Sequence, residues 1–453
     1  MVKDLKPKYG LFTAIAMVVG IAIGSGVFFK ADDVLTASGG NLGLALLAWL
    51  IGGLIMLLGG YSFSLVASKI SEVNGLVDYT EAGYGKNAGY YVGWFQTIIY
   101  YPTLTGVLAW VAGLYTVSLL GLEGNAVWYC TLIYFSTIFI MNYFAPVLAG
   151  KFQVSTTVFK LVPLVLVAVI GTVIGLSNGM TVENFKVAAD GVTGGGLSAA
   201  ILSTAFAYEG WVVATSLNAE IKDSKKNLPK AFIFGSLIIM VVYLTYYLGL
   251  SGTISNSVFI QEGDHAVTLA VQQLFGNFAG TMLTVFVIVS CLGTLNGLFL
   301  GTSRGMYSLA YRNRGPFPEI FSEVDDKNNV PKASTLFGGF ITIVWLVVWF
   351  GNFQGWYGVE RFFDTSELPI AVLYFVYILI YIWIMRTFKD LGIFKRFIIP
   401  GLALIGALVI IYGAMLKDYS FLFLMITLAV MLLGKILDGV TLKKNKTSET
   451  VVE

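Results

Sequence analysis

The sequence predicts an all-α polytopic membrane protein with twelve transmembrane helices. Hydrophobic residues make up 57% of the 453 positions and charged residues only 12%, whereas a soluble domain carries about 25% charged residues. Apolar runs long enough to cross a bilayer recur along the chain, and polar segments separate them. The net charge of +2 is too small to suggest a nucleic-acid partner.

Twelve apolar runs are expected to be the membrane spans. They cover residues 11–35, 41–69, 88–120, 125–145, 153–177, 197–219, 229–251, 266–300, 333–351, 362–386, 397–416 and 419–437. The third and eighth runs are longer than an upright span needs, so we expect them to tilt or to extend beyond the bilayer.

The basic residues predict the orientation of these spans. With both termini on one side, that side holds most of the 28 Lys and Arg residues. The other side holds Lys30, Lys186, Arg361 and Lys417, and Lys160 lies within a span. An excess of Lys and Arg marks cytoplasmic loops. We therefore expect a multi-pass protein of the cell membrane with both termini in the cytoplasm.

Two spans are interrupted where a membrane helix should be continuous. The first run contains Gly24-Ser25-Gly26, and the sixth contains Glu209 and Gly210. Glycine disfavours helix formation, but it is also common at close helix contacts in membranes. Each interruption alone is therefore weak evidence for a binding site. The two spans, however, begin successive groups of five, and an offset of five inverts the topology. Paired breaks in such inverted repeats predict a central binding site.

Three stretches resemble a known transporter superfamily. Gly20–Phe29 resembles the first-helix motif of the amino acid–polyamine–organocation superfamily, residues 206–231 resemble its sixth helix and following loop, and Gly293–Pro318 resembles its eighth helix and exit. The closest branch is the L-type amino-acid transporter family, in its bacterial alanine-serine-cysteine or serine/threonine exchanger form. The resemblance runs over most of the chain.

This resemblance implies one transporter domain over residues 1–453. It comprises a first inverted repeat (11–178), a second (197–386), helices 11 and 12 (397–437) and a cytoplasmic tail (438–453). It also implies exchange of amino acids across the membrane. In human members a cysteine between spans 3 and 4 joins a heavy subunit, but the loop at 121–125 has no cysteine. We therefore expect no covalent heavy subunit.

A zwitterionic amino acid needs donors for its carboxylate and acceptors for its ammonium. Free N–H groups after the first break supply the donors, and free carbonyls at both breaks supply the acceptors. By resemblance, Phe206 is an aromatic gate. The predicted substrate-binding residues are Ala22, Gly24, Ser25, Gly26, Val27, Phe206, Ala207 and Glu209. We expect a bulky residue at Gly26 to block the carboxylate without unfolding the protein.

Glu209 departs from the family pattern, in which a small or apolar residue precedes Gly-Trp. A carboxylate inside a membrane is costly and usually functional. Two interpretations stay open: Glu209 titrates in proton coupling, or it has a structural hydrogen-bonding role.

Lys160 is the other charged residue within a span. If span 5 begins near Phe152, Lys160 lies about 12 Å inside it. Its ammonium either snorkels to water or reaches the broken part of span 1. Sodium-coupled relatives of the resembled fold hold a cation between spans 1, 5 and 8. The resemblance implies that Lys160 replaces this cation, with Tyr243 and Ser290 as polar neighbours.

The sequence thus favours a sodium-independent exchanger of small neutral L-amino acids such as alanine, serine, cysteine or threonine, working by alternating access. A proton-coupled symporter of the same fold and a non-transporting amino-acid sensor are the alternatives. No nucleophile–base pair, cofactor motif or spaced set of metal ligands supports an enzyme, a cofactor or a metal site. The expected partners are amino-acid substrates and membrane lipids.

Overall fold

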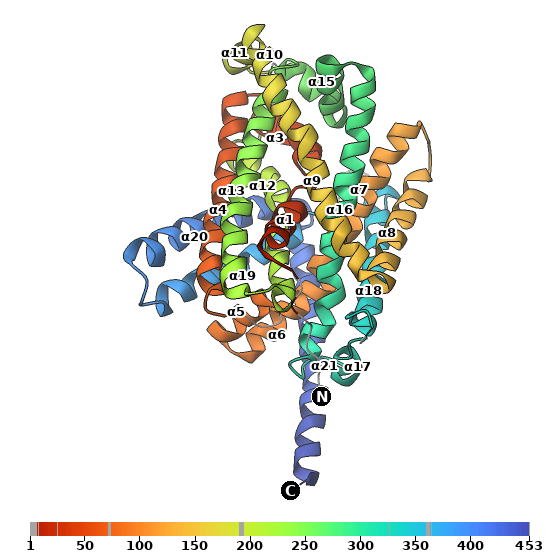
Figure 1. Cartoon of the computed structure of the whole chain (residues 1–453), viewed down its shortest axis with the longest axis vertical. Coiled ribbons are helices and arrows are strands. Elements are labelled where there is room, and N and C mark those ends of the chain that lie inside the picture. Colours follow the sequence, from red (N-terminus) through yellow and green to blue (C-terminus); the bar gives the residue numbers. More distant parts are fainter. Residues whose placement is uncertain are drawn as a thin grey trace.

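The computed structural model describes residues 7, 9–24, 26–70, 74–189, 194–325, 327–358, 363 and 365–452. Within these ranges, eleven helices are long and apolar enough to cross a membrane. A shorter apolar helix, α1 (Leu11–Ala22), begins the broken first span. The protein is therefore a multi-pass helical membrane protein, as predicted, and the twelve spans form one bundle (Figure 1).

The remaining spans follow in chain order, and several consist of two or three helical pieces. They are α4 (Leu42–Ala67); α6 (Lys86–Phe95), η1 (Gln96–Tyr100) and α7 (Tyr101–Leu120); α8 (Ala126–Phe144); α9 (Pro146–Leu166), η2 (Val167–Gly171) and α10 (Thr172–Ser177); α12 (Leu197–Tyr208) and η3 (Trp211–Glu220); α13 (Ser224–Leu250); α16 (Asn277–Ala310); α18 (Lys332–Phe353); α19 (Leu368–Thr387); η5 (Phe394–Ile398) and α20 (Ile399–Met415); and α21 (Ser420–Val452).

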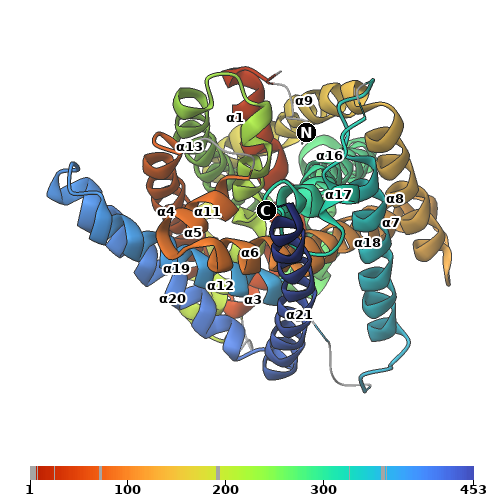
Figure 2. The same cartoon turned by 90° about the horizontal axis from the view of Figure 1, so that it is seen from below.

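Short helices connect the spans at both ends of the bundle. They are α3 (Ala31–Ala37), α5 (Gly75–Tyr84), α11 (Met180–Lys186), α14 (Asn256–Glu262), η4 (Gly263–His265), α15 (Ala266–Phe275) and α17 (Pro318–Phe321). Helices α11 and α15 lie at one end of the bundle, whereas α5, α17 and the C-terminal part of α21 lie at the other, which we call the terminus end (Figure 1). Seen from the terminus end, α20 lies at one edge of the bundle and α18 at another (Figure 2).

The first span is broken after Ala22. The backbone of Ile23 is extended, with φ −74° and ψ 91°, and helix resumes as α2 (Gly26–Phe29). The N–H groups of Lys30 and Val34 bond to the carbonyls of Gly26 and Lys30. Helices α2 and α3 are therefore nearly continuous, and the predicted break leaves two half-helices.

The sixth span is broken at Glu209 and Gly210. Glu209 is extended, and Gly210 has φ +99°, a conformation that side chains with a Cβ rarely adopt. The two breaks touch each other: a Cβ placed on Gly26 would lie 2.5 Å from the Cα of Ala207. The paired breaks of an inverted-repeat fold thus meet in the middle of the bundle.

One predicted boundary is wrong. The eighth run, expected at 266–300, is divided at Gly276 (φ +86°) into the short helix α15 and the span α16, which continues to Ala310. The error arose because hydropathy alone does not detect a turn at a glycine. Helix α21 continues to Val452, so the described part of the segment expected as a tail from 438 is helical.

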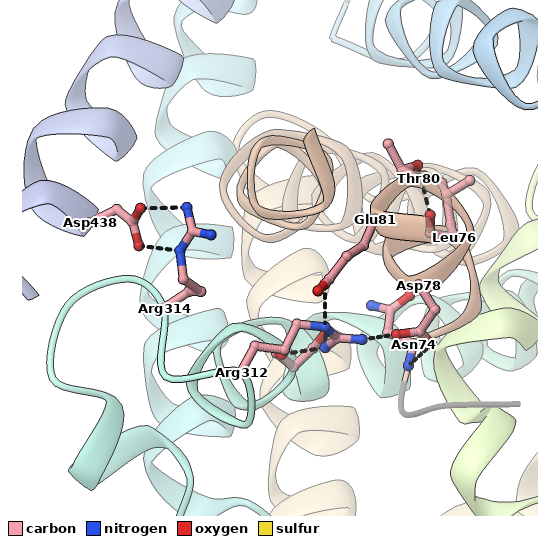
Figure 3. A network of polar contacts seen from close by, with 9 residues as sticks. Asn74, Leu76, Asp78, Thr80, Glu81, Arg312, Arg314 and Asp438 are labelled. Atoms are coloured by element: carbon pink, nitrogen blue, oxygen red, sulfur yellow. Dashed lines mark hydrogen bonds and ion pairs between the residues drawn. The ribbon is translucent and has the colours of Figure 1, made fainter. Parts of the chain in front are cut away.

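Ion pairs hold the terminus end of the bundle together (Figure 3). Arg312, which follows α16, pairs with Asp78 and, at 3.3 Å, with Glu81 of α5. Arg314 makes a two-pronged contact with Asp438 of α21, at 2.8 and 2.6 Å. Paired, parallel guanidinium–carboxylate bonds are strong and directional. They fix the exit of α16 against α5 and α21.

Candidate functional site

A small cavity lies between the two helix breaks. Its volume is about 30 Å³, and one water needs roughly 10–15 Å³ on this measure. Its walls come from the two breaks and from α7, α16 and α19. The lining residues are Ile21, Ala22, Gly24, Gly26, Leu104, Leu108, Phe206, Glu209, Gly210, Thr294, Leu298 and Ile370. In this closed state the site has room for only a few waters, so an amino acid must expand it.

Lys160 reaches the break in the first span. Its Nζ donates to the carbonyl of Gly20 at 2.7 Å and to the carbonyl of Ile23. It also lies 3.3 Å from the carbonyl of Ser290 and 3.2 Å from the Thr294 hydroxyl. Lys160 is fully buried. The positive charge of the ammonium is therefore stabilised by uncharged carbonyl and hydroxyl oxygens that converge on it from the end of α1 and from α16. A bound metal cation would be surrounded in a similar way.

Hydroxyl groups also contact the carbonyls that the first break exposes. Ser290 donates to Gly24 O at 2.9 Å, and Thr294 lies 3.1 Å from Ile23 O. The Tyr243 hydroxyl lies 3.1 Å from both Ala22 O and Ala207 O, so it joins the two breaks. Buried carbonyls without partners are costly in a membrane. These side chains explain how an unwound segment is tolerated at this depth.

Glu209 faces the same cavity from the second break. Its Oε1 accepts hydrogen bonds from Tyr100 at 2.7 Å and from Tyr377 at 3.2 Å. Oε2 is buried and has no partner of good geometry among the described residues, although the Gly210 backbone contributes as a weaker donor. The carboxyl group is therefore anchored at one oxygen, and the other has no partner of good geometry among the described residues.

The structure brings only some of the predicted substrate-binding residues to the cavity. Ala22, Gly24, Gly26, Phe206 and Glu209 line it. Val27 and Ala207 are buried outside the lining, and Ser25 lies outside the described residues.

The expectation for Gly26 needs correction. Any Cβ at this position would collide with the Ala207 backbone at 2.5 Å. A bulky residue at Gly26 would therefore disrupt the packing of α2 on α12, rather than act on the substrate alone. For this reason its loss of transport would not identify the carboxylate site.

Several site residues were missed from the sequence. Thr294 lies one helical turn after Ser290, and that spacing places both residues on one face of α16. The sequence therefore contained the signal that would have predicted Thr294 as a site residue. Leu104, Leu108, Leu298 and Ile370 form an apolar wall of the cavity. Nothing in the sequence distinguished them from the other apolar residues of their spans.

A buried ion pair closes the terminus side of the two breaks. Arg304 of α16 pairs with Glu220, the last residue of η3, at 2.6 Å, and both side chains are buried. The backbone N–H of Tyr9 donates to Glu220 O at 2.9 Å. This contact ties the start of α1 to the end of the sixth span and to α16.

The two broken helices, their shared cavity and the closures around it define a membrane transporter with inverted repeats. The profile of the amino acid permease family matches residues 9–433. The chain belongs to this family, whose members are transporters rather than enzymes.

Individual proteins that are similar to this chain include amino-acid transporters. The chain is 31% identical over 384 residues to the serine/threonine exchanger SteT of Bacillus subtilis, covering 84% of each protein. It is 24% identical to the mouse b(0,+)-type amino acid transporter 1, over 82% of this chain and 77% of that protein. The crystal structure of MhsT in complex with L-phenylalanine matches with a TM-score of 0.57 at 15% identity, over 90% of this chain and all of that one. The last similarity concerns the fold alone.

Proposed function

We propose that this protein exchanges small neutral L-amino acids, such as alanine, serine, cysteine or threonine, across a membrane by alternating access and without sodium. The observation that carries the proposal is the buried ammonium of Lys160 among the oxygens of α1 and α16. It occupies the type of oxygen-lined position that would otherwise suit a cation. The 31% identity to a serine/threonine exchanger supports the substrate class.

The substrate would lie across the two breaks. Its carboxylate would face the N–H groups at the start of α2, near Ser25, Gly26 and Val27, where free donors and the helix dipole favour an anion. Its ammonium would face carbonyls near Ala22 and Phe206. Ala22 O already accepts a bond from Tyr243, but a carbonyl oxygen has two lone pairs and can accept a second.

The side-chain part of the pocket supports a neutral substrate. Leu104, Leu108, Leu298 and Ile370 offer apolar contact, and Phe206, the proposed gate, lines the same cavity. A strongly polar or charged side chain would find few partners along this wall.

Proton-coupled symport is the alternative, and Glu209 is the observation that favours it. A buried carboxyl group with one nearly unpartnered oxygen at the cavity is suited to taking up a proton. In the exchanger we prefer, Glu209 is structural and holds α12 to η1 and α19 through Tyr100 and Tyr377.

We further propose that both termini are cytoplasmic in the cell membrane, on the basis of the Lys and Arg distribution. The repeats would span 11–178 and 197–386, with helices 11 and 12 at 397–437. We expect no covalent heavy subunit, because Cys130 lies within α8 and Cys291 is buried in α16.

Counterflow in proteoliposomes tests this proposal. Purified protein is reconstituted, the liposomes are loaded with one of twenty unlabelled amino acids, and uptake of labelled serine is measured. We expect internal alanine, serine, cysteine and threonine to drive uptake, and leucine and arginine to drive little. Uptake into empty liposomes under an inward proton gradient, independent of internal amino acid, would instead support the symporter.

A further inference from the structure

The turn between α19 and α20 carries an excess of positive charge. Its eleven residues from 386 to 396 include four basic side chains and one acidic side chain, namely Arg386, Lys389, Lys395 and Arg396 against Asp390. Asp390 pairs at 2.7 Å with Lys69, which lies just after α4. The one acidic residue is therefore neutralised from outside the turn, and the four basic residues are not balanced within it.

Three of these four basic side chains are free to bind an anion. Arg396 donates to the carbonyls of Met385 and Arg386, at 2.8 and 3.2 Å, and so caps the end of α19. The side chains of Arg386, Lys389 and Lys395 are exposed, and they form no ion pair or hydrogen bond in the part of the chain that the structure describes. We call these three residues the basic trio.

Apolar side chains are exposed in the same turn. Ile393 is 74% exposed and Phe394 is 65% exposed, and Phe397 and Ile398 are also exposed. The turn follows α19, whose 20 residues match the length that crosses the hydrocarbon core. It therefore lies at the level of the lipid headgroups. Basic residues beside large apolar residues are typical of segments that lie in this membrane interface.

The position of the turn in the bundle makes it accessible to lipid. The Lys69–Asp390 ion pair and the close packing of Gly83 of α5 against Trp383 of α19 place this end of α19 at the terminus end. Seen from that end, α19 and α20 form a hairpin that projects from the bundle, with the turn at its outer tip (Figure 2). Lipids would therefore contact the turn from several sides.

We infer that the turn between α19 and α20 is a binding surface for anionic phospholipids. The basic trio would donate hydrogen bonds to the phosphate and the rest of the headgroup, and the acyl chains would lie against Ile393 and Phe394. A soluble anion would use the basic trio but would leave these apolar side chains in water. The combination of both kinds of side chain therefore favours a lipid.

A lipid bound here would hold one end of a span that borders the substrate site. Helix α19 is continuous from Leu368 to Thr387. Ile370, near its start, lines the cavity, and Tyr377, in its middle, donates to Glu209. The lipid would fix the other end of this helix at the membrane surface. The inference goes beyond the proposed function, and it holds whichever solute the protein transports.

A fluorescent probe in the turn measures lipid binding without any transport. Gly392→Cys is introduced into a Cys130→Ser background and labelled with bimane. Gly392 is exposed, a Cβ built there has no atom within 4 Å, and the remaining Cys291 is buried. The protein is reconstituted in phosphatidylcholine vesicles that contain a fraction of doxyl-labelled phosphatidylglycerol or doxyl-labelled phosphatidylcholine. Quenching of bimane gives the relative association of the two lipids.

The parent protein should prefer the anionic lipid. A basic residue near an anionic membrane surface strengthens association by about fivefold, so phosphatidylglycerol should associate at least about fivefold more strongly than phosphatidylcholine. High salt should lower this ratio because it screens the charges. Substitution of the whole basic trio by Gln should bring the ratio to about one.

The matched control removes three other exposed lysines at the terminus end. Lys222→Gln, Lys225→Gln and Lys226→Gln together change the net charge by the same amount, next to the start of α13. This control variant should keep the parent preference. Phe394→Ser should weaken the association of both lipids alike, because it removes apolar contact and leaves the charges in place.

An equal preference of the two lipids in the parent, or a preference that survives loss of the basic trio, would overturn the inference. So would an equal loss in the control variant, which would show an effect of net charge alone. Relief of quenching by added inorganic phosphate would assign the basic trio to a soluble anion instead. If the triple variant does not fold, Lys389→Gln with Lys395→Gln, which leaves α19 unchanged, should give an intermediate ratio, and an unchanged ratio would contradict the inference.

Discussion

The two helix breaks meet at one cavity, but their polar groups are arranged in opposite ways. At the first break, the carbonyls of Gly20, Ala22, Ile23 and Gly24 accept hydrogen bonds from one ammonium group and three hydroxyl groups. At the second break, the carboxyl group of Glu209 is held by two phenol hydroxyls at one oxygen only. Each of these carbonyls at the first break thus has at least one donor, whereas Glu209 Oε2 at the second break has no partner of good geometry among the described residues.

This difference separates two roles. Side chains from α9 and α16 lock the first break, so its shape depends on how those helices lie against α1. The second break is linked to η1 and α19 through Tyr100 and Tyr377. We therefore expect removal of the side chains that hold the carbonyls of the first break to act on the coupling of helix movements, and changes to the Glu209 side chain to act on substrate recognition or proton dependence.

Removing the ammonium from the first break should have the largest effect. Lys160→Ala leaves the carbonyls of Gly20 and Ile23 with fewer donors and removes the link between α9 and α1. A hydrogen bond from a charged group contributes about 1.5–3 kcal/mol, so serine exchange should fall by about ten- to a hundredfold. Exchange rates in serine-loaded proteoliposomes provide the measurement.

Lys151→Ala is the matched control for this substitution, because Lys151 is an exposed lysine of the same helix. Equal exchange by Lys160→Ala and Lys151→Ala would contradict the assigned role and favour a lysine that merely reaches for water.

Two substitutions of Glu209 distinguish amino-acid exchange from proton-coupled symport. Glu209→Gln keeps an acceptor for Tyr100 and Tyr377 but cannot titrate, whereas Glu209→Ala leaves both hydroxyls without this partner. If Glu209 is structural, the Gln variant should exchange serine within about threefold of the parent, and the Ala variant should lose about tenfold. Loss of all proton-dependent uptake in the Gln variant, with exchange retained, would show that Glu209 couples protons.

Removing the Tyr243 hydroxyl, which bridges the two breaks, should have the smallest effect on transport. Tyr243→Phe keeps the ring but removes the hydroxyl that lies between Ala22 O and Ala207 O. A neutral hydrogen bond contributes about 0.5–1.5 kcal/mol, so the KM for serine should rise by roughly three- to tenfold. An unchanged KM with a changed maximal rate would assign Tyr243 to the reorientation step instead.

The fold was largely predictable because its signals are local. Apolar runs mark spans, and glycine within a run marks a break, so the twelve spans and the breaks at Gly24 and Gly210 could be found without a structure. The division at Gly276 was missed, since the hydropathy on both sides is similar.

The site was only partly predictable because its contacts join distant segments. Thr294 could have been found from its spacing to Ser290. The partners of Glu209 could not, because Tyr100 and Tyr377 lie 109 and 168 residues away from it in the chain and resemble the other tyrosines of the sequence. The contact between Gly26 and Ala207 could not be predicted from the sequence either, and it changes how a substitution at Gly26 would be interpreted.

The sodium dependence of serine exchange tests the central claim most directly. Labelled serine enters serine-loaded proteoliposomes, with sodium or with an equal concentration of choline, and with or without an imposed membrane potential. Because Lys160 already supplies a fixed positive charge and a zwitterion carries no net charge, we expect the same rate in all four conditions. Exchange that requires sodium would contradict the proposal that Lys160 takes the place of a coupling cation.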